Sequence, residues 1–273
     1  MELDEAKARV RRTYNLAADH FDDAALSFWA RAGARTIELT GLAPGNRVLD
    51  VCCGSGATAI PAAQAVGRFG TVLGVDLADG LLELGRVKAA ALGLTNIEFR
   101  AADVETMRFP EGSCDAVVCQ FGIFFLTDME AATRRLWSLV APGGALAITS
   151  WGQRVLEPAM SIFLELVAAE RPDLKERSRR PWDRISTAEQ LKSLYLDAGV
   201  PEPEVVADEG IHALAAPTDF WTIMAGSGSR GTISALGEPG AARVRDKLLR
   251  RLEEEAIRGV ETNVLYAVAR RPK

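Results

Sequence analysis

The sequence predicts a doubly wound α/β fold, in which helices cover both faces of a mostly parallel sheet. Short apolar segments of β type alternate with helical segments between residues 47 and 151, and this alternation is typical of parallel sheets. A glycine-rich turn joins the first strand to the helix after it. Apolar residues make up 48% of the 273-residue chain, which is enough for a large buried core.

The first forty residues are predicted to be helical. Residues 3–20 have a polar helical pattern, and residues 24–40 form a second helix with Leu26, Trp29 and Ile37 roughly on one side. The sequence GLAPG then ends the pattern, because glycine and proline interrupt helices. The alternating region begins after this break.

The alternating region carries five predicted strands. They span residues 47–51, 71–76, 96–103, 114–122 and 145–151. The helices between them span residues 57–66, 78–93 and 128–140. The strands are apolar on both sides, as burial between two helical layers requires.

The second half of the chain is less regular. Residues 156–170 and 187–200 are predicted to be helices, residues 204–214 have strand character, and residues 217–258 hold one or two helices. The last apolar run, residues 262–270, is expected to pair antiparallel at the edge of the sheet.

Charge and composition argue against several classes of partner. The net charge is −5, so the chain has no general attraction for phosphate backbones, and no nucleic acid is expected. No apolar run approaches the roughly 20 residues that span a bilayer. The charged start MELDEAKARVRR lacks the apolar stretch of a secretory signal. We therefore expect a cytoplasmic protein with no membrane partner.

The spacing of the four cysteines does not predict a disulfide framework. Cys52 and Cys53 are adjacent, and Cys114 and Cys119 lie in another predicted strand. Cysteine is usually a small buried hydrophobic residue. A soft-metal site that joins Cys119 to one of the adjacent pair is the alternative, but no metal is expected.

The turn after the first strand is the most informative segment. It reads VLDVCCGSGAT from Val48 to Thr58. Gly54 and Gly56 let a ligand approach the main chain closely, and the helix that follows presents free N–H groups to an anionic group.

Three aspartates are predicted to meet at one rim of the sheet. Asp50, Asp76 and Asp103 lie at the carboxyl ends of three successive strands, where open α/β sheets bind ligands. Asp50 would attract a cationic amino group, Asp76 would accept from ribose hydroxyls, and Asp103 would accept from an adenine amino group. Each alone also suits a helix N-cap, so the combination with the glycine turn carries the inference.

Two cofactors fit parts of this pattern. Gly54, Gly56 and Ala59 satisfy the loose dinucleotide pattern, so an NAD(P)-dependent oxidoreductase is the alternative function. Asp50 would repel a pyrophosphate but attract the ammonium group of S-adenosyl-L-methionine. The position of this charge favours S-adenosylmethionine.

Several motifs in the right order carry a resemblance to a known family. They read VLDVCCGSGATAI, VLGVDLADGLLELGR, EFRAADVETMRFPEGSCDAVVCQFGIFFLTD and LVAPGGALAITSW. Over residues Tyr14 to Trp151 the chain resembles the class I S-adenosylmethionine-dependent methyltransferases, and closely the small-molecule branch that includes the ubiquinone and menaquinone biosynthesis methyltransferases. The resemblance implies a Rossmann-like, seven-stranded sheet with an antiparallel last strand and helical lid insertions. It also implies methyl transfer to a small molecule.

The resemblance further implies a division of the chain and a set of cofactor-binding residues. Residues 1–40 would form a helical lid, 41–152 the cofactor-binding core, and 153–273 a C-terminal part with substrate-cap helices and the final edge strands. The cofactor-binding residues would be Tyr14, Asp50, Gly54, Ser55, Gly56, Asp76, Leu77, Asp103, Val104 and Gln120. Cys53 stands where relatives often have a small residue or glycine.

The acceptor side is less defined. A general base helps when the acceptor is a hydroxyl or a protonated amine, and the candidates are His212, His20 and Asp22. An apolar acceptor pocket is expected from Phe21, Phe121, Phe124, Trp151, Trp221 and Met224, whereas Phe125 is assigned to core packing. Residues 218–231 combine aromatic side chains with a glycine-serine stretch, as a mobile cover would need.

The acceptor atom is left open among oxygen, nitrogen and carbon, because fold does not fix function. The segment after the fourth predicted strand, Gln120 to Phe124, lacks the Asn/Asp-Pro-Pro-aromatic motif of enzymes that methylate planar nitrogens. The aromatic candidates favour a hydrophobic or aromatic acceptor. Either a monomer or a homodimer is expected. A non-catalytic binding protein with this fold is the third interpretation.

Overall fold

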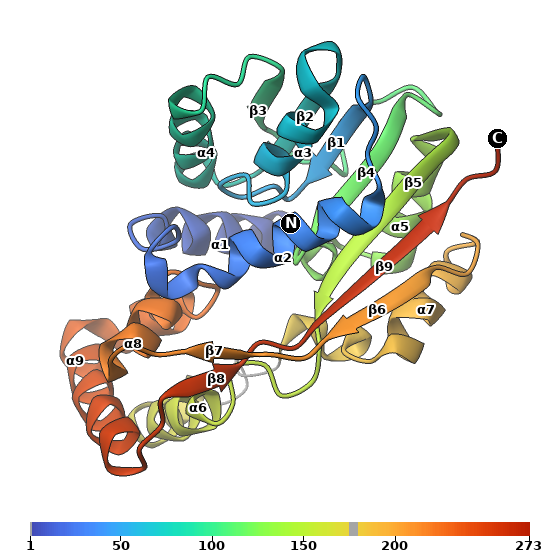
Figure 1. Ribbon diagram of the computed structural model, residues 1–273. Helices are drawn as coiled ribbons and strands as arrows, with labels where there is room; N and C mark the ends of the chain where they lie inside the picture. The colour runs from blue at the N-terminus through green and yellow to red at the C-terminus, as the bar shows by residue number, and fades with distance from the viewer. Residues whose placement is uncertain (1, 175–179) are drawn as a thin grey trace.

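A computed structural model describes residues 2–174 and 180–273. Its described strands confirm the predicted doubly wound sheet, which has seven strands in the order β3-β2-β1-β4-β5-β9-β6 (Figure 1). The strands of this sheet are β1 (Arg47–Val51), β2 (Thr71–Asp76), β3 (Ile97–Ala101), β4 (Cys114–Gln120), β5 (Val140–Trp151), β6 (Glu204–Asp208) and β9 (Val264–Arg270). A separate two-stranded sheet pairs β7 (Ile211–Ala213) with β8 (Gly259–Glu261).

The α-helices fall close to the predicted ranges. They are α1 (Glu2–Ala17), α2 (Phe28–Thr40), α3 (Ala59–Val66), α4 (Asp79–Ala91), α5 (Met129–Ser138), α6 (Ala159–Glu170), α7 (Ala188–Asp197), α8 (Pro217–Ala225) and α9 (Arg230–Glu254). Short 3-10 turns add η1 (Ala24–Leu26), η2 (Gly67–Phe69), η3 (Ile123–Phe125) and η5 (Pro181–Ile185). Among the described residues, none of the helices has the length and apolar character that crossing a bilayer requires.

The strand directions explain where the ligand rim lies. β3, β2, β1, β4 and β5 run parallel, so their carboxyl ends meet along one edge of the sheet. The strand order reverses between β1 and β4, which is the switch point where such sheets bind ligands.

The last strand is antiparallel as expected, but its place was predicted wrongly. β9 pairs with β5 on one side and with β6 on the other, so β6 forms the edge of the sheet. The predicted strand over 204–214 is also two strands, because β7 leaves the main sheet and pairs with β8.

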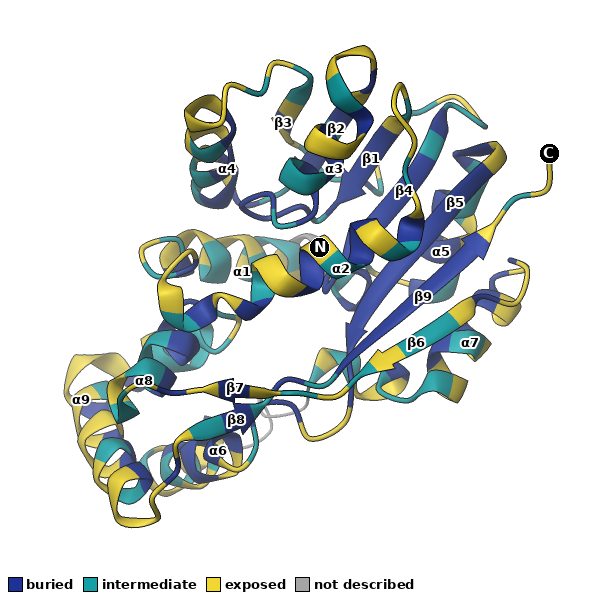
Figure 2. Cartoon of the chain, in the orientation of Figure 1, coloured by how far each residue is buried: buried dark blue, intermediate teal, exposed yellow. Residues whose placement is uncertain are grey.

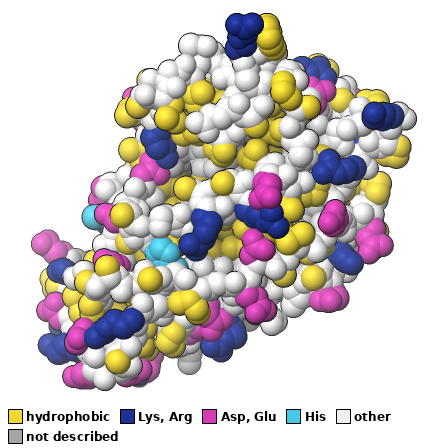
Figure 3. All heavy atoms as spheres, in the orientation of Figure 1, with side chains coloured by type: hydrophobic (Ala, Val, Ile, Leu, Met, Phe, Trp, Pro, Cys, Tyr) yellow, Lys and Arg dark blue, Asp and Glu magenta, His cyan; other side chains and the backbone are white. Residues whose placement is uncertain are grey.

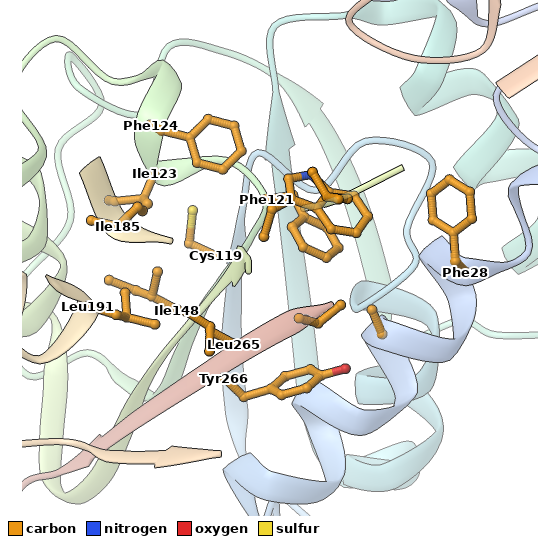
Figure 4. Packing of buried hydrophobic residues seen from close by; sticks show 14 of the residues in the cluster. Phe28, Cys119, Phe121, Ile123, Phe124, Ile148, Ile185, Leu191, Leu265 and Tyr266 are labelled. Atoms are coloured by element: carbon orange, nitrogen blue, oxygen red, sulfur yellow. The ribbon is translucent and has the colours of Figure 1, made fainter. Parts of the chain in front are cut away.

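Alternate residues of the central strands pack into two separate hydrophobic cores, one on each face of the sheet. In β1, Leu49 joins the core on the side of α5, α6 and α7, whereas Val48 joins the core beneath α3. β4 repeats the pattern with Val117 and Ala116. This is the two-residue period of a strand covered on both faces, and most residues of β1, β4 and β5 are buried (Figure 2). On the first side Cys119, Ile148 and Leu191 point toward one another (Figure 4).

The N-terminal helices lie over the carboxyl rim of the sheet. In α2, Gly33 packs so closely on the glycine turn that a Cβ atom there would lie 2.0 Å from the carbonyl oxygen of Ala57. In α1, the side-chain oxygen of Asn15 accepts from the N–H of Gly80 at the start of α4 (2.9 Å). Helices α6, α8 and α9 and the small sheet extend the molecule at the lower left of Figure 1.

Candidate functional site

The main chain takes rare conformations on both sides of the switch point. Cys52, directly after β1, has φ of 56°, and Phe121, directly after β4, has φ of 51°. Non-glycine residues rarely adopt positive φ, and such positions concentrate at functional sites. Gly54, at φ 53°, extends the turn where glycine is the residue that tolerates this geometry.

A cavity of about 110 Å³ opens at this rim, and we call it the rim cavity. Its wall comes from α1, the glycine turn, the carboxyl ends of β2 and β3, and the turn after β4. The wall includes seven of the ten predicted cofactor-binding residues, namely Tyr14, Gly54, Asp76, Leu77, Asp103, Val104 and Gln120. Asp50, Ser55 and Gly56 are the predicted residues that do not line it in the described part of the chain.

Asp50 lies directly behind the wall. Its side chain is fully buried, and one carboxyl oxygen accepts from the hydroxyl of Thr58 at 2.5 Å, a residue that does line the rim cavity. The other oxygen, Oδ1, has no hydrogen-bond partner. Burial, partly offset by the Thr58 hydrogen bond, raises the pKa of Asp50 to about 7.

Asp76 accepts from main-chain groups on both sides of the rim cavity. Its two oxygens accept from the N–H of Gly54 (2.9 Å) and the N–H of Ala78 (2.8 Å). Burial raises the pKa of this carboxyl, and these hydrogen bonds oppose the rise. A carboxylate oxygen has two lone-pair sites, so Asp76 keeps acceptor capacity toward the cavity.

Asp103 is held by α1. The Lys7 ammonium of α1 lies 2.5 Å from Asp103 Oδ2 and 2.8 Å from Glu105 Oε2. The other Asp103 oxygen accepts from the N–H of Glu105. Both carboxylates raise the pKa of Lys7 against the lowering effect of its burial, so α1 is tied by charge to the end of β3.

Unpartnered polar atoms mark this region. Among the described residues, the buried side-chain atoms without a hydrogen-bond partner are Trp29 Nε1, Asp50 Oδ1, Gln120 Oε1 and Trp182 Nε1. Trp29 and Gln120 line the rim cavity, and Gln120 is oriented by its amide, which donates to the Trp29 carbonyl (3.1 Å). Buried polar atoms are normally satisfied, so these atoms are available to a polar ligand.

Two residues of the glycine turn have other roles. The Ser55 hydroxyl donates to Asp22 (2.6 Å) and accepts from Lys88 (2.9 Å). A Cβ atom at Gly56 would lie 2.9 Å from the ring of Phe99, so this glycine allows close packing. Neither residue lines the rim cavity of the described structure, and a role of either in cofactor binding stays a prediction.

A second cavity of about 1290 Å³ adjoins the first, and we call it the large cavity. It lies between α1, the turn after β4, the end of β5, α6 and residues 227–235. The two cavities share Val10, Tyr14, Trp29, Phe121 and Phe125, which we call the shared wall. Phe121 and Phe124 project from the turn that follows β4, across from Phe28 of α2 (Figure 4).

The predicted acceptor residues divide between the two cavities and the core. Phe121, Phe124 and Trp151 line the large cavity as expected. Phe21 lines the rim cavity instead. Trp221 and Met224 are corrected, because in the described structure they line neither cavity and Met224 is fully buried in the core.

The three candidate bases lie outside both cavities of the described structure. His212 is buried, its Nε2 bonds the Ala25 carbonyl (2.8 Å), and burial lowers its pKa. His20 is half-buried, with its Nε2 3.9 Å from Asp19 Oδ2. Asp22 forms an ion pair with Lys88 (2.8 Å). These contacts assign structural roles, so we drop all three as bases.

Sequence reasoning missed three aromatic residues that shape the site. Phe125 was assigned to the core but lines both cavities. Trp29 was placed only on a helix face, and Trp182 lies in a turn that no motif singled out. Their aromatic type was the available signal, but their convergence depends on the tertiary fold.

The structure holds the four cysteines as free thiols. The Cys52 thiol lines the rim cavity, and its neighbour Cys119 together with burial raises its pKa. Among the described residues, no group of three or more His, Cys, Asp or Glu side chains is placed to hold a metal ion.

Comparison of the sequence with protein families agrees with this geometry. The ubiE/COQ5 methyltransferase family matches residues 3–168. The chain belongs to the ubiE/COQ5 methyltransferase family. This result confirms the resemblance and identifies S-adenosylmethionine as the cofactor, and the comparisons give no support to the oxidoreductase alternative.

Individual proteins similar to this ubiE/COQ5 family member agree with the family assignment. The chain is 35% identical to the aklanonic acid methyltransferase DauC of Streptomyces sp. (strain C5) over 53% of its length and 66% of DauC. It is 35% identical to the ubiquinone/menaquinone biosynthesis C-methyltransferase UbiE of Pseudomonas putida (strain GB-1), over 70% of this chain and 77% of UbiE. Across the first curated relatives the chain spans 56 to 66% of their own length.

A solved structure shares the fold. YjhP from E. coli aligns with a TM-score of 0.60 and 19% identity, over 95% of this chain and 100% of YjhP. At this identity the match shows the fold.

Proposed function

We propose that this chain is an S-adenosylmethionine-dependent methyltransferase that methylates a small hydrophobic or aromatic metabolite. The observation that carries the proposal is the shared wall. The rim cavity, with its aspartates, meets the large cavity, with its aromatic side chains, across five residues. A donor in the first and an acceptor in the second would lie next to each other.

The residues present fit the cofactor. The unpartnered oxygens of Asp50 and Gln120 are acceptors for an ammonium group, which the methionine part carries. Asp76 offers its remaining lone pairs to ribose hydroxyls. Leu77 and Val104 supply apolar contact to the adenine ring from the same wall, with Asp103 beside them.

When bound, the cofactor supplies a methyl group on a positively charged sulfur. The chain's part is to position the two molecules and exclude water, and orientation can contribute on the order of 7–11 kcal/mol. The aromatic faces of the shared wall also suit a cationic neighbour.

The shared wall offers no general base among the described residues. Tyr14 is its one titratable side chain, and burial holds the pKa of its hydroxyl well above the usual range. Tyr14 therefore stays protonated at neutral pH. The chain suits an acceptor whose nucleophilic atom needs no deprotonation by the protein.

The character of the acceptor follows from the lining of the large cavity. Phe28, Phe124, Trp151 and Phe163 are among the aromatic side chains there, and rings favour stacking with other rings. DauC is named for an acid and UbiE for quinone biosynthesis, which supports an apolar organic acceptor.

Two experiments test the proposal. S-adenosylhomocysteine should raise the melting temperature, because it binds the native state, whereas NADH should not. Methyl-labelled S-adenosylmethionine, incubated with a panel of aromatic acids, phenols and quinols, should give a labelled product by mass spectrometry. Stabilisation by NADH, or binding of S-adenosylhomocysteine with no turnover on any member of the panel, would contradict the proposal. The second result would favour the non-catalytic interpretation.

Four features expected from the sequence stay predictions. They are the cytoplasmic location, the absence of a nucleic-acid partner, the monomeric or homodimeric state, and the division of the chain after residues 40 and 152. Figure 3 shows acidic and basic side chains interspersed over one face of the molecule, and this distribution fits a small-molecule partner.

A further inference from the structure

The charged side chains in the wall of the large cavity are unequal in sign. Among the described residues they are Arg9, Arg12, Arg180 and Glu165. Glu165 is engaged by Arg251 at 2.9 Å, and Arg180 lies 3.0 Å from Asp183. The wall therefore carries a surplus of positive charge, although the protein as a whole is acidic.

Arg9 and Arg12 are the charged residues of this wall that pair with no described carboxylate. Both are exposed on α1 at the rim of the cavity, one turn apart, and the described side chains form no ion pair with either. Glu5 lies one turn before Arg9 on the same helix and forms no ion pair with it. These two guanidinium groups are free to bind an anion, and guanidinium matches carboxylate geometry well.

A second observation within the same cavity is independent of these charges. The indole N–H of Trp182 is buried and has no hydrogen-bond partner among the described residues, and Trp182 lines the large cavity. An indole N–H only donates. This group therefore bonds only to an acceptor atom, and an anion supplies acceptor atoms for it as well as charge for the two arginines.

We propose that the acceptor is an arene that carries an acidic group ionised at neutral pH, recognised by Arg9 and Arg12 with the Trp182 N–H as a further donor. This inference rests on the proposed function, because it names the substrate class of the same large cavity. The aromatic wall binds the ring system, and the positive rim selects the anion.

A pair of probes that differ only in charge tests the inference. Trp29, Trp151 and Trp182 line the cavity, so binding of anthraquinone-2-carboxylate or neutral anthraquinone-2-carboxamide is measured by quenching of tryptophan fluorescence. The wild-type protein should bind the carboxylate at least about tenfold more tightly at low salt, and the preference should shrink as salt screens the charges.

Substitutions test whether the preference for the carboxylate depends on the residues named above. The double variant Arg9→Gln, Arg12→Gln should reduce the preference to below about threefold and leave the affinity for the carboxamide unchanged. Trp182→Phe keeps a ring but removes the N–H, and should weaken the carboxylate more than the carboxamide. Arg245→Gln is the matched control, because Arg245 is exposed on α9 away from the cavity wall and its loss should have no effect.

The outcomes separate this inference from the proposed function. Equal affinity for the two probes, failure of both to bind, or a preference that survives the double variant would overturn the inference. Calorimetry with S-adenosylhomocysteine is run on each variant. Intact cofactor binding and turnover of neutral acceptors would leave the methyltransferase proposal standing, whereas absent cofactor binding in the wild type would defeat it.

Discussion

The rings of Phe121 and Trp151 stack with their centroids 4.0 Å apart and their planes at 15°. Phe121 follows β4 and belongs to the shared wall, whereas Trp151 ends β5 and lines the large cavity. The parallel pairing of β4 with β5 brings the two strand ends together. The stack thus holds Phe121 in place in the shared wall between the two cavities.

Replacing Trp151 should separate acceptor binding from cofactor binding. Trp151→Leu removes the ring that supports Phe121 on the acceptor side, so kcat/KM for the acceptor should fall about tenfold or more. The Kd of S-adenosylhomocysteine should change less than about twofold. A buried large-to-small change costs a few kcal/mol of stability, so thermal unfolding is measured alongside. A parallel loss of cofactor affinity would contradict the assignment.

Asp76 should carry a large part of the cofactor affinity. Asp76→Ala removes the acceptor for the ribose and leaves the N–H groups of Gly54 and Ala78 unpaired. Hydrogen bonds to charged groups contribute about 1.5–3 kcal/mol, so calorimetry should show affinity lower by roughly tenfold or more. Glu83→Ala, an exposed acid on α4 paired with Arg86, should leave it unchanged. Unchanged affinity in Asp76→Ala would refute the ribose role.

Cofactor binding should depend on pH through Asp50. Its pKa is raised to about 7, so the carboxyl is largely protonated at pH 6, and the ammonium group prefers the ionised form. The affinity for S-adenosylhomocysteine relative to adenosine, which lacks the amino acid, should rise from pH 6 to pH 8. Without ligand, the raised pKa makes its full contribution to the free energy of unfolding below the ordinary carboxyl pKa. This contribution is lost as the pH rises through about 7.

The control for this pH dependence is Asp50→Asn, which should abolish the rise. Calorimetry at pH 6.5 in buffers of different ionisation enthalpy should show proton release on binding in the wild type and none in the variant. An affinity ratio that is flat with pH in the wild type would exclude Asp50 as the ammonium acceptor.

Lys7 should slow the release of the cofactor. Its contacts with Asp103 and Glu105 hold α1 over the rim cavity, and a partly buried pair of this kind contributes on the order of 1 kcal/mol. Lys7→Met should therefore raise the dissociation rate of S-adenosylhomocysteine about fivefold in displacement kinetics. Lys192→Met, which removes an exposed pair with Glu202, should not. Identical rates in both variants would show that the lid is not held by charge.

The residues that line the rim cavity were largely predictable from the sequence, because their placement depends on local order. A short apolar strand followed by an aspartate, as at Asp76, places a carboxylate at the carboxyl end of that strand, and parallel strands bring such ends together. The glycine turn was equally visible in the sequence. That Ser55 and Gly56 do not line the rim cavity was not visible, because the sequence of a turn does not reveal which of its residues face inward.

The acceptor side was not predictable, because it depends on contacts between distant segments. The hydrogen bond that holds His212 to Ala25 joins residues 187 positions apart. Trp182 reaches the large cavity from a turn with no periodic pattern. The place of β9 inside the sheet depends on β6 pairing outside it, and the alternation of strands and helices does not encode that order.

A crystal structure with S-adenosylhomocysteine tests the central claim most directly. The account predicts that the ligand occupies the rim cavity, with its amino group against Asp50 and Gln120, its ribose on Asp76 and its sulfur facing the shared wall. A ligand bound elsewhere, or a sulfur atom turned away from the large cavity, would contradict it.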